Sequence, residues 1–198
     1  MSARIDRVVT SGTFNLDGGT WAVDNNVWLV GDDEEVLVID ASHDAAAISA
    51  AIGDRRVVAI VCTHGHDDHI NAVGDLVDAT GAPVWLHPDD RMLWDSLYEP
   101  APDQELVDGV QLSVAGEVLE AVHTPGHSPG STCLYAPSLN AVLTGDTLFK
   151  GGPGATGRSY SDHDTIVGSI RNRLLTLPPQ TVVHTGHGET TTIGAESL

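Results

Sequence analysis

The chain has 198 residues, of which 41% are hydrophobic and 19% are charged, which is typical of a folded protein and excludes a disordered one. Its 28 Asp and Glu residues outnumber its 9 Lys and Arg residues, so the formal net charge is −19 at pH 7. Such a surface repels phosphate backbones and anionic membranes. We therefore expect neither nucleic acid nor membrane among its partners.

The N-terminal segment and the two cysteines indicate the compartment. The first residues, MSARIDRVVTSG, lack the apolar segment of a secretory signal, and no apolar run is long enough to span a membrane. Cys62 and Cys133 lie in apolar runs and are expected to be buried, reduced thiols. We expect a cytoplasmic protein.

The first half of the chain alternates short apolar runs with segments of helical periodicity. The apolar runs predict strands at residues 27–30, 36–39, 57–61 and 84–86. The first two flank a polar turn, as in a β-hairpin, and the third is apolar throughout, as in a strand buried on both faces. Helices are predicted at residues 44–53, between an Asp and a Gly, and at residues 68–80.

The second half is dominated by strands, which are predicted at residues 110–114, 117–122, 131–135, 141–144 and 181–184. One helix is predicted at residues 162–176, before the Pro178-Pro179 pair that cannot continue it. The glycine-rich residues 150–160 predict a long surface loop, and such loops are often functional. Strands with helices on their outer sides predict a layered α/β protein.

The strongest chemical signal follows the predicted strand 57–61. It is the run His64-Gly65-His66-Asp67-Asp68-His69, with the pattern H-x-H-x-D-H. A solvated polar loop is the alternative, but it gives no reason for three imidazoles to be crowded together. Imidazole and carboxylate groups at this density suit zinc, or iron and manganese. The motif therefore predicts a metal site.

Three later loops each present one further candidate ligand beside a glycine, where the backbone can approach a crowded centre closely. They are residues 124–130 with His127, residues 144–147 with Asp146, and residues 185–188 with His187. Any one of them could be only a turn. Together with the first motif they provide seven ligands, which is enough for two metal ions.

The order H-x-H-x-D-H, T-P-G-H-S-P-G, T-G-D and G-H-G, from about Asp40 to His187, resembles the metallo-β-lactamase fold superfamily. The resemblance implies a four-layer αββα sandwich with the metals at one edge of its two sheets. It implies His64, His66 and His127 on the first metal, Asp68, His69 and His187 on the second, Asp146 between them, and Asp40 orienting the ligands.

Within this superfamily, T-P-G-H-S-P-G with a bridging aspartate is most similar to glyoxalase II and its small bacterial relatives. Zinc β-lactamases usually lack that aspartate, and the acidic charge argues against the RNA substrates of ribonuclease Z relatives. Larger glyoxalase II enzymes carry a C-terminal helical domain. This chain ends at residue 198, 11 residues after His187, so we expect a single domain over residues 1–198 without it.

The predicted function is hydrolysis of an acyl-thiol by a hydroxide that two divalent ions share, with zinc expected and Asp68 as the catalytic residue among the ligands. The thiol carrier stays open between glutathione, mycothiol and similar thiols, and the oligomeric state stays open too. The alternatives are a mononuclear-iron persulfide dioxygenase and a lactonase or β-lactamase-type hydrolase. The dioxygenases usually carry Gly-Arg-Thr-Asp where this chain has Gly157-Arg158-Ser159-Tyr160, which favours hydrolysis.

Residues in the long loop are candidates for binding the substrate. In glyoxalase II relatives, a basic residue followed two positions later by tyrosine contacts the thiol carrier, and Arg158 and Tyr160 fit that pattern. Lys150, the only lysine, opens the same loop; the alternative is a solvated loop whose charges aid solubility. The other histidines are expected to be structural or at the surface, with His163 and His184 left open: His43, His87, His123, His163 and His184.

Overall fold

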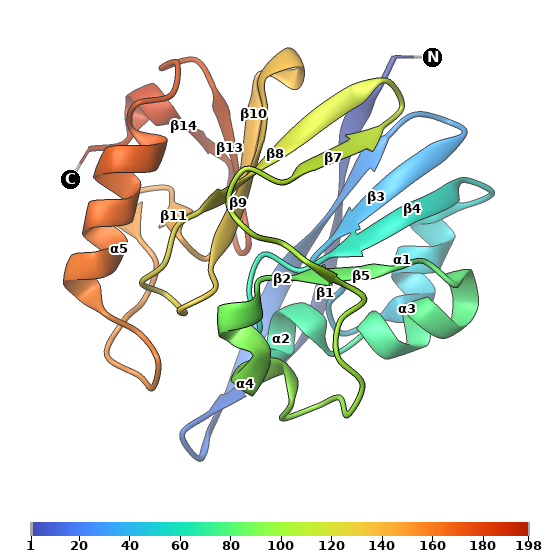
Figure 1. The fold of residues 1–198 in the computed structure, drawn as a ribbon, viewed down its shortest axis with the longest axis horizontal. Coiled ribbons are helices and arrows are strands. Elements are labelled where there is room, and N and C mark those ends of the chain that lie inside the picture. The colour runs from blue at the N-terminus through green and yellow to red at the C-terminus, as the bar shows by residue number, and fades with distance from the viewer. Residues whose placement is uncertain (1, 198) are drawn as a thin grey trace.

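A computed structural model describes residues 2–197 and contains two six-stranded sheets that face each other. The strand order is β1-β2-β3-β4-β5-β6 in the first sheet and β14-β13-β10-β9-β8-β7 in the second, and β11 pairs separately with β12. Figure 1 shows α1 and α3 on the outer side of the first sheet and α5 on the outer side of the second. This four-layer αββα sandwich is the fold predicted from the sequence.

The elements have the following bounds. The first sheet contains β1 (Arg4–Leu16), β2 (Gly19–Gly31), β3 (Glu35–Ile39), β4 (Arg56–Val61), β5 (Val84–Leu86) and β6 (Gln104–Glu105). The second contains β7 (Gln111–Val114), β8 (Glu117–His123), β9 (Thr132–Ala136), β10 (Ala141–Gly145), β13 (Val182–Thr185) and β14 (Thr191–Thr192), and the small sheet contains β11 (Leu148–Phe149) and β12 (Gly152–Pro153). The α-helices are α1 (Ala45–Ile52), α2 (Asp67–Ile70), α3 (Val73–Thr80), α4 (Arg91–Trp94) and α5 (His163–Ser169). The 3₁₀ turns are η1 (Pro88–Asp90), η2 (Pro137–Leu139) and η4 (Ile193–Ala195), and η3 (Ile170–Leu174) is a π-helical turn.

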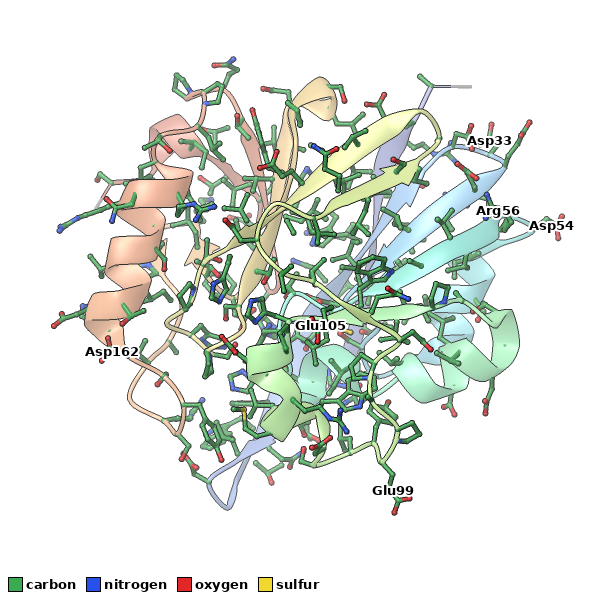
Figure 2. All side chains as sticks on the ribbon, viewed as in Figure 1. Asp33, Asp54, Arg56, Glu99, Glu105 and Asp162 are labelled. Atoms are coloured by element: carbon green, nitrogen blue, oxygen red, sulfur yellow. The ribbon has the colours of Figure 1, made fainter. Side chains whose placement is uncertain are left out.

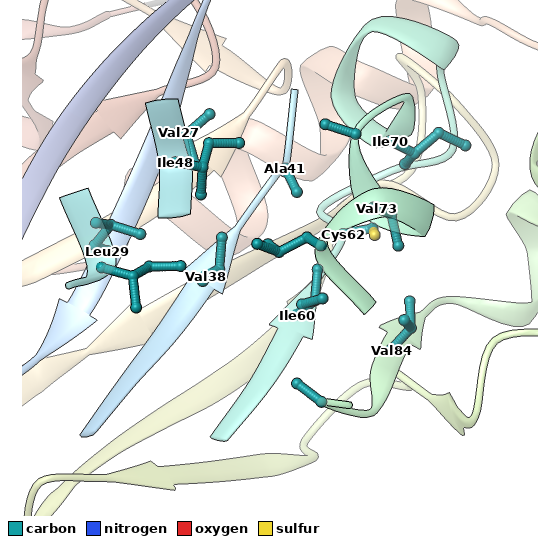
Figure 3. Close-up of a cluster of buried hydrophobic side chains, with 14 of the residues drawn as sticks. Val27, Leu29, Val38, Ala41, Ile48, Ile60, Cys62, Ile70, Val73 and Val84 are labelled. Carbon is teal, nitrogen blue, oxygen red and sulfur yellow. The ribbon is translucent and has the colours of Figure 1, made fainter. Parts of the chain in front are cut away.

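Alternation of side chains along the central strands divides the apolar residues between two layers. Along β2, Val27 and Leu29 pack with the helices, whereas Trp28 and Val30 pack between the sheets. Figure 3 shows the helix-facing cluster, in which Ile48 of α1 lies near Val27. The central strands β2, β3 and β4 of the first sheet therefore carry apolar residues on both faces, as the continuous runs predict.

The second sheet is covered by α5 and η3. Ile166, Ile170 and Leu174 are fully buried and pack with Val142 of β10 and Val183 of β13. Exposed acidic side chains lie outside these layers: Figure 2 shows Asp33, Asp54 and Glu99 at the periphery of the molecule, and all three are exposed. Within residues 2–197, no helix combines the length and the apolar character needed to cross a membrane.

The structure corrects several predicted boundaries. The helix predicted at residues 68–80 is two helices, because Asn71 and Ala72 turn away to bond the loop after β3: the Asn71 side chain accepts from His43 N at 2.6 Å, and Ala72 N donates to Ala41 O at 3.1 Å. The helix predicted at residues 162–176 is α5 followed by the π-helical turn η3. The N-terminal strand β1 and the long first part of β2 were not predicted from the sequence.

Candidate metal centre

The predicted ligands lie on loops that leave the carboxyl ends of strands at one edge of both sheets. Asp40 follows β3 and His64 follows β4, and these strands are parallel. Asp146 follows β10 and His187 follows β13, which are also parallel. Parallel strands end at the same edge, so ligands distant in sequence come together there.

The first group of ligands is His64, His66 and His127. His66 Nδ1 lies 3.0 Å from His64 Nε2 and 3.0 Å from His127 Nε2. All three side chains are buried. The H-x-H spacing places two rings from one loop at right angles, with an interplanar angle of 86°, and the loop after β8 supplies the third. Three nitrogens thus converge on one point.

The second group is Asp68, His69 and His187. His187 Nε2 lies 3.2 Å from His69 Nε2 and 3.4 Å from Asp68 Oδ2. Asp68 and His69 lie in α2, which follows β4 of the first sheet, and His187 lies in the loop after β13 of the second sheet. Both groups therefore draw ligands from loops of both sheets.

Asp146 lies between the two groups. Its Oδ2 is 3.5 Å from His127 Nε2 in the first group and 3.3 Å from His187 Nε2 in the second. Its Oδ1 is 3.3 Å from His69 Nε2, is buried, and makes no hydrogen bond to any atom of residues 2–197. Gly186 leaves room for this carboxylate, since a Cβ there would lie 2.2 Å from Asp146 Oδ1. The Asp146 carboxylate thus lies within reach of both groups.

Most of the converging rings are held in place by a hydrogen bond at their other nitrogen. A carbonyl or carboxylate oxygen only accepts, so a ring nitrogen bonded to one must donate. The bonds of this kind are His127 Nδ1 to Ala155 O at 2.8 Å, His187 Nδ1 to Asp24 O at 2.8 Å, and His69 Nδ1 to Asp40 Oδ2 at 3.0 Å. With the proton at Nδ1, a neutral ring presents its Nε2 lone pair to the centre.

His64 is oriented through a hydroxyl group. Thr63 Oγ1 donates to Asp40 Oδ2 at 2.7 Å, so it accepts from His64 Nδ1 at 3.1 Å. Asp40 therefore orients His69 directly and His64 through Thr63. It also accepts from Thr63 N at 2.7 Å, and its own φ of 57° lies in the left-handed region. These hydrogen bonds are compatible with the orienting role that the resemblance implied for Asp40.

The electrostatics of the centre favour cations. Burial lowers the pKa of His66 to about 3, so this ring is neutral and free to act as a ligand. Burial also lowers the pKa of His187, but the Asp146 and Asp68 carboxylates together outweigh burial and raise that pKa to about 10. Lone pairs converging beside ionised carboxylates, with one carboxylate oxygen lacking a partner within residues 2–197, fit divalent metal ions in place of protons.

Two residues that the sequence analysis missed support this centre. Asn25 is fully buried in β2, and its Nδ2 donates to Asp68 Oδ2 at 2.9 Å. The Oδ1 of the same side chain accepts a hydrogen bond from His43 Nε2 at 2.9 Å. Asp90, fully buried at the end of η1, bonds both loops that carry the first group. The only sequence signal for Asn25 is its place in the polar pair Asn25-Asn26 that precedes the apolar run of β2.

A cavity of about 360 Å³ opens onto the centre. The residues in its wall include Phe14, Asp68, Asp146 and Arg158. The Arg158 guanidinium lies 3.9 Å from the ring centroid of Trp21, so the N-terminal hairpin and the long loop meet at the mouth.

The other two candidate substrate residues lie outside this wall. Tyr160 is 54% exposed and does not line the cavity. Lys150 forms an ion pair with Glu189 and does not line it either. Of the two open histidines, His163 is exposed and His184 packs edge-on against Trp28, with ring centroids 4.5 Å apart.

Known proteins resemble this chain in sequence and in fold. The model of the metallo-beta-lactamase superfamily matches residues 20–187. The hydroxyacylglutathione hydrolase GloC of Haemophilus influenzae is 33% identical over 192 residues, which cover 88% of this chain and 91% of that protein. The chain is thus similar to a protein named as a hydroxyacylglutathione hydrolase over most of both lengths.

Two solved structures have the same fold. TTHA1623 in a di-iron-bound form has a TM-score of 0.80 at 33% identity, covering 94% of this chain and 96% of its own. The BLEG-1 B3 metallo-beta-lactamase has a TM-score of 0.81 at 31% identity, covering 94% and 95%. The family match, these similarities and the ligand geometry lead to one conclusion: the chain belongs to the metallo-beta-lactamase superfamily.

Proposed function

We propose that this protein hydrolyses an acyl-thiol ester at a centre of two divalent metal ions, with zinc as the expected metal. The observation that carries the proposal is the position of Asp146 between two complete groups of three ligands. The similarity to a hydroxyacylglutathione hydrolase supports the choice of substrate class. In the reaction, water forms the new C–O bond, the C–S bond breaks, and an acid and a thiol are released.

The protein would hold one ion with His64, His66 and His127 and the other with Asp68, His69 and His187, with Asp146 shared. When bound, such ions polarise a carbonyl group and lower the pKa of water, which removes the need for a serine or cysteine nucleophile. The two cysteines fit this view, because both are fully buried and burial raises the pKa of each thiol.

The chain's own carboxylates supply the proton acceptors. Burial raises the pKa of Asp68, but His69 and the hydrogen bonds from His187 and Asn25 lower it to about 2. Asp68 is therefore ionised at neutral pH, lines the cavity, and can accept a proton from the attacking water. This is the catalytic role that we propose for it.

Arg158 is the group that would bind the far end of the substrate. Its guanidinium lies over the rings of Trp21 and Phe14, at 3.9 and 5.3 Å from their centroids, so it is fixed at the cavity mouth. A carboxylate on the thiol carrier would bind such a fixed guanidinium. We propose this role for Arg158 and assign none to Tyr160 or Lys150, which lie outside the cavity wall.

The test is an activity panel combined with metal analysis. Purified protein is assayed on thioesters that share one acyl group and differ in carrier, on a β-lactam, and on a persulfide with oxygen uptake recorded. We expect thioester hydrolysis with close to two metal ions per chain. His66→Ala should abolish it and reduce metal content, whereas His163→Ala, which changes an exposed histidine, should not. One iron per chain with oxygen uptake on the persulfide would refute the proposal.

A second candidate function is hydrolysis of β-lactams, which the 31% identity to the BLEG-1 B3 metallo-beta-lactamase favours. Both reactions add water to a carbonyl carbon and use the same proton acceptors. They differ in the leaving group, a thiolate in one case and an amide nitrogen in the other. The β-lactam arm of the panel separates them.

A further inference from the structure

A short segment without predicted ligands covers the first group of the metal centre. It consists of η1 and α4, residues 88–94, and lies beside α2 at the lower edge of the sheets in Figure 1. Leu93 and Asp90 point inward from it and are buried, at 6% and 0% exposure. An aspartate with no exposed surface needs partners for both carboxylate oxygens.

Asp90 finds those partners on two separate loops. Gly65 N donates to Asp90 Oδ2 at 2.8 Å, from the peptide between His64 and His66. Ser128 Oγ donates to the same oxygen at 2.7 Å, and Gly130 N donates to Oδ1 at 2.6 Å. The last two donors follow His127 in its loop. One carboxylate thus connects both loops that supply the first group.

Two glycines of these loops, Gly65 and Gly130, lie against the segment that carries Asp90. A Cβ on Gly130 would lie 2.7 Å from Asp90 Cγ, and a Cβ on Gly65 would lie 2.9 Å from the Cβ of Leu93 and 3.2 Å from that of Asp90. Both loops therefore approach the segment more closely than a larger residue allows. The glycine in H-G-H and the last glycine of T-P-G-H-S-P-G therefore both fit against this one segment.

Asparagine cannot replace this carboxylate without loss. Its amide has one acceptor oxygen, whereas Asp90 accepts at both oxygens, from a backbone N–H on each loop. Either orientation of the amide leaves its NH₂ group facing Gly65 N or Gly130 N. One of the two loops must then move away.

We propose that Asp90 is a positioning residue that sets the distance between His127 and the His64–His66 pair, and so the metal affinity of the first group alone. The second group does not depend on it, because Asp68 and His187 are held from β2, by the Asn25 side chain and by Asp24 O. The inference concerns metal binding and is independent of the thioester chemistry proposed above.

The test compares Asp90→Asn with Asp89→Asn, the same change at the neighbouring aspartate, whose side chain is 60% exposed. Zinc affinities are measured by chelator competition, occupancies at each group by anomalous scattering from crystals, and stability by thermal unfolding of metal-free protein. We expect Asp90→Asn to weaken zinc binding at the first group about 10- to 100-fold and to leave the second group occupied, which is the effect of removing an outer partner of metal ligands. Asp89→Asn should change neither group.

A graded variant keeps the proposal testable if Asp90→Asn does not fold. Ser128→Ala removes one of the three donors, and we expect a smaller loss at the same group. Unchanged zinc affinity at the first group would overturn the proposal. So would equal losses at both groups together with a lower melting temperature of the metal-free protein, which would assign Asp90 a general structural role. Lack of thioesterase activity would refute the proposed function and leave this result intact.

Discussion

Replacing Asp40 with asparagine should weaken metal binding at the group formed by Asp68, His69 and His187. Asp40 accepts three hydrogen bonds, from Thr63 N at Oδ1 and from Thr63 Oγ1 and His69 Nδ1 at Oδ2. Its φ of 57° is a conformation that asparagine adopts more readily than most residues, so the backbone should be preserved. The substitution therefore changes the hydrogen bonds and leaves the loop in place.

The size of the effect follows from the proton of His69. If the amide NH₂ takes the place of Oδ2, His69 Nδ1 can no longer donate, and its proton moves to Nε2, where it blocks the metal. If the amide turns around, its NH₂ faces Thr63 N at 2.7 Å, and a buried donor without a partner costs about 1–3 kcal/mol. Both outcomes match a loss of about 10- to 100-fold in metal affinity, or about 1.4–2.8 kcal/mol.

Zinc titration of the metal-free variant with a competing chelator measures this loss. The first ion, bound by His64, His66 and His127, should keep its affinity within a few-fold, since Thr63 can still accept from His64 Nδ1. The second should bind about 10- to 100-fold more weakly. If both ions bind as in the parent protein, Asp40 does not set the tautomer of His69, and the tautomer argument fails.

Four further outcomes can be checked. Asp146→Asn should reduce occupancy at one or both groups and slow the reaction about 10²-fold, or about 3 kcal/mol, as measured by metal analysis and steady-state rates. Arg158→Ala should raise KM about tenfold for carriers that bear a carboxylate, with kcat and metal content unchanged. In the metal-free protein the pKa of His187 is raised to about 10, so protonated His187 stabilises the folded state. This stabilisation is complete below about pH 6.5 and is lost as the pH rises towards 10. Thermal melts of the metal-free protein across this pH range should show a falling melting temperature. Leu134→Ala, at a fully buried position between the sheets, should lower the free energy of unfolding by about 2–5 kcal/mol in urea titrations.

The layered fold could be predicted because its central strands are apolar on both faces. The run 57–61 and the predicted hairpin at 27–30 and 36–39 lie where the sequence places them. The N-terminal strand β1 could not, because only Thr10 and Phe14 along it are buried, which is too few for an alternating pattern. The division of residues 68–80 into two helices depends on hydrogen bonds to the distant loop at residues 41–43. The spacing of apolar residues along a helix cannot predict such bonds.

The seven candidate ligands could be listed from the sequence because each lies in a short motif of polar residues and glycine. The structure shows their convergence and adds the residues behind them. Asn25 and Asp90 lie 43 and 25 positions from the partners they bond, Asp68 and Gly65. Single residues at such separations give no motif. Lys150 was singled out as a rare cation, but its neighbour in space is Glu189, which is remote in sequence.

Each ligand group draws on loops from both sheets, and this arrangement links metal binding to the cohesion of the whole sandwich. An ion at either group fastens one sheet to the other at their shared edge, in addition to the apolar contacts between them. Any ion that binds only the folded chain adds its binding free energy to that of folding. Without metal, the two sheets should therefore separate more easily. The rate of backbone hydrogen exchange should then rise first at the strand ends nearest the metal centre, before it rises in the outer helices.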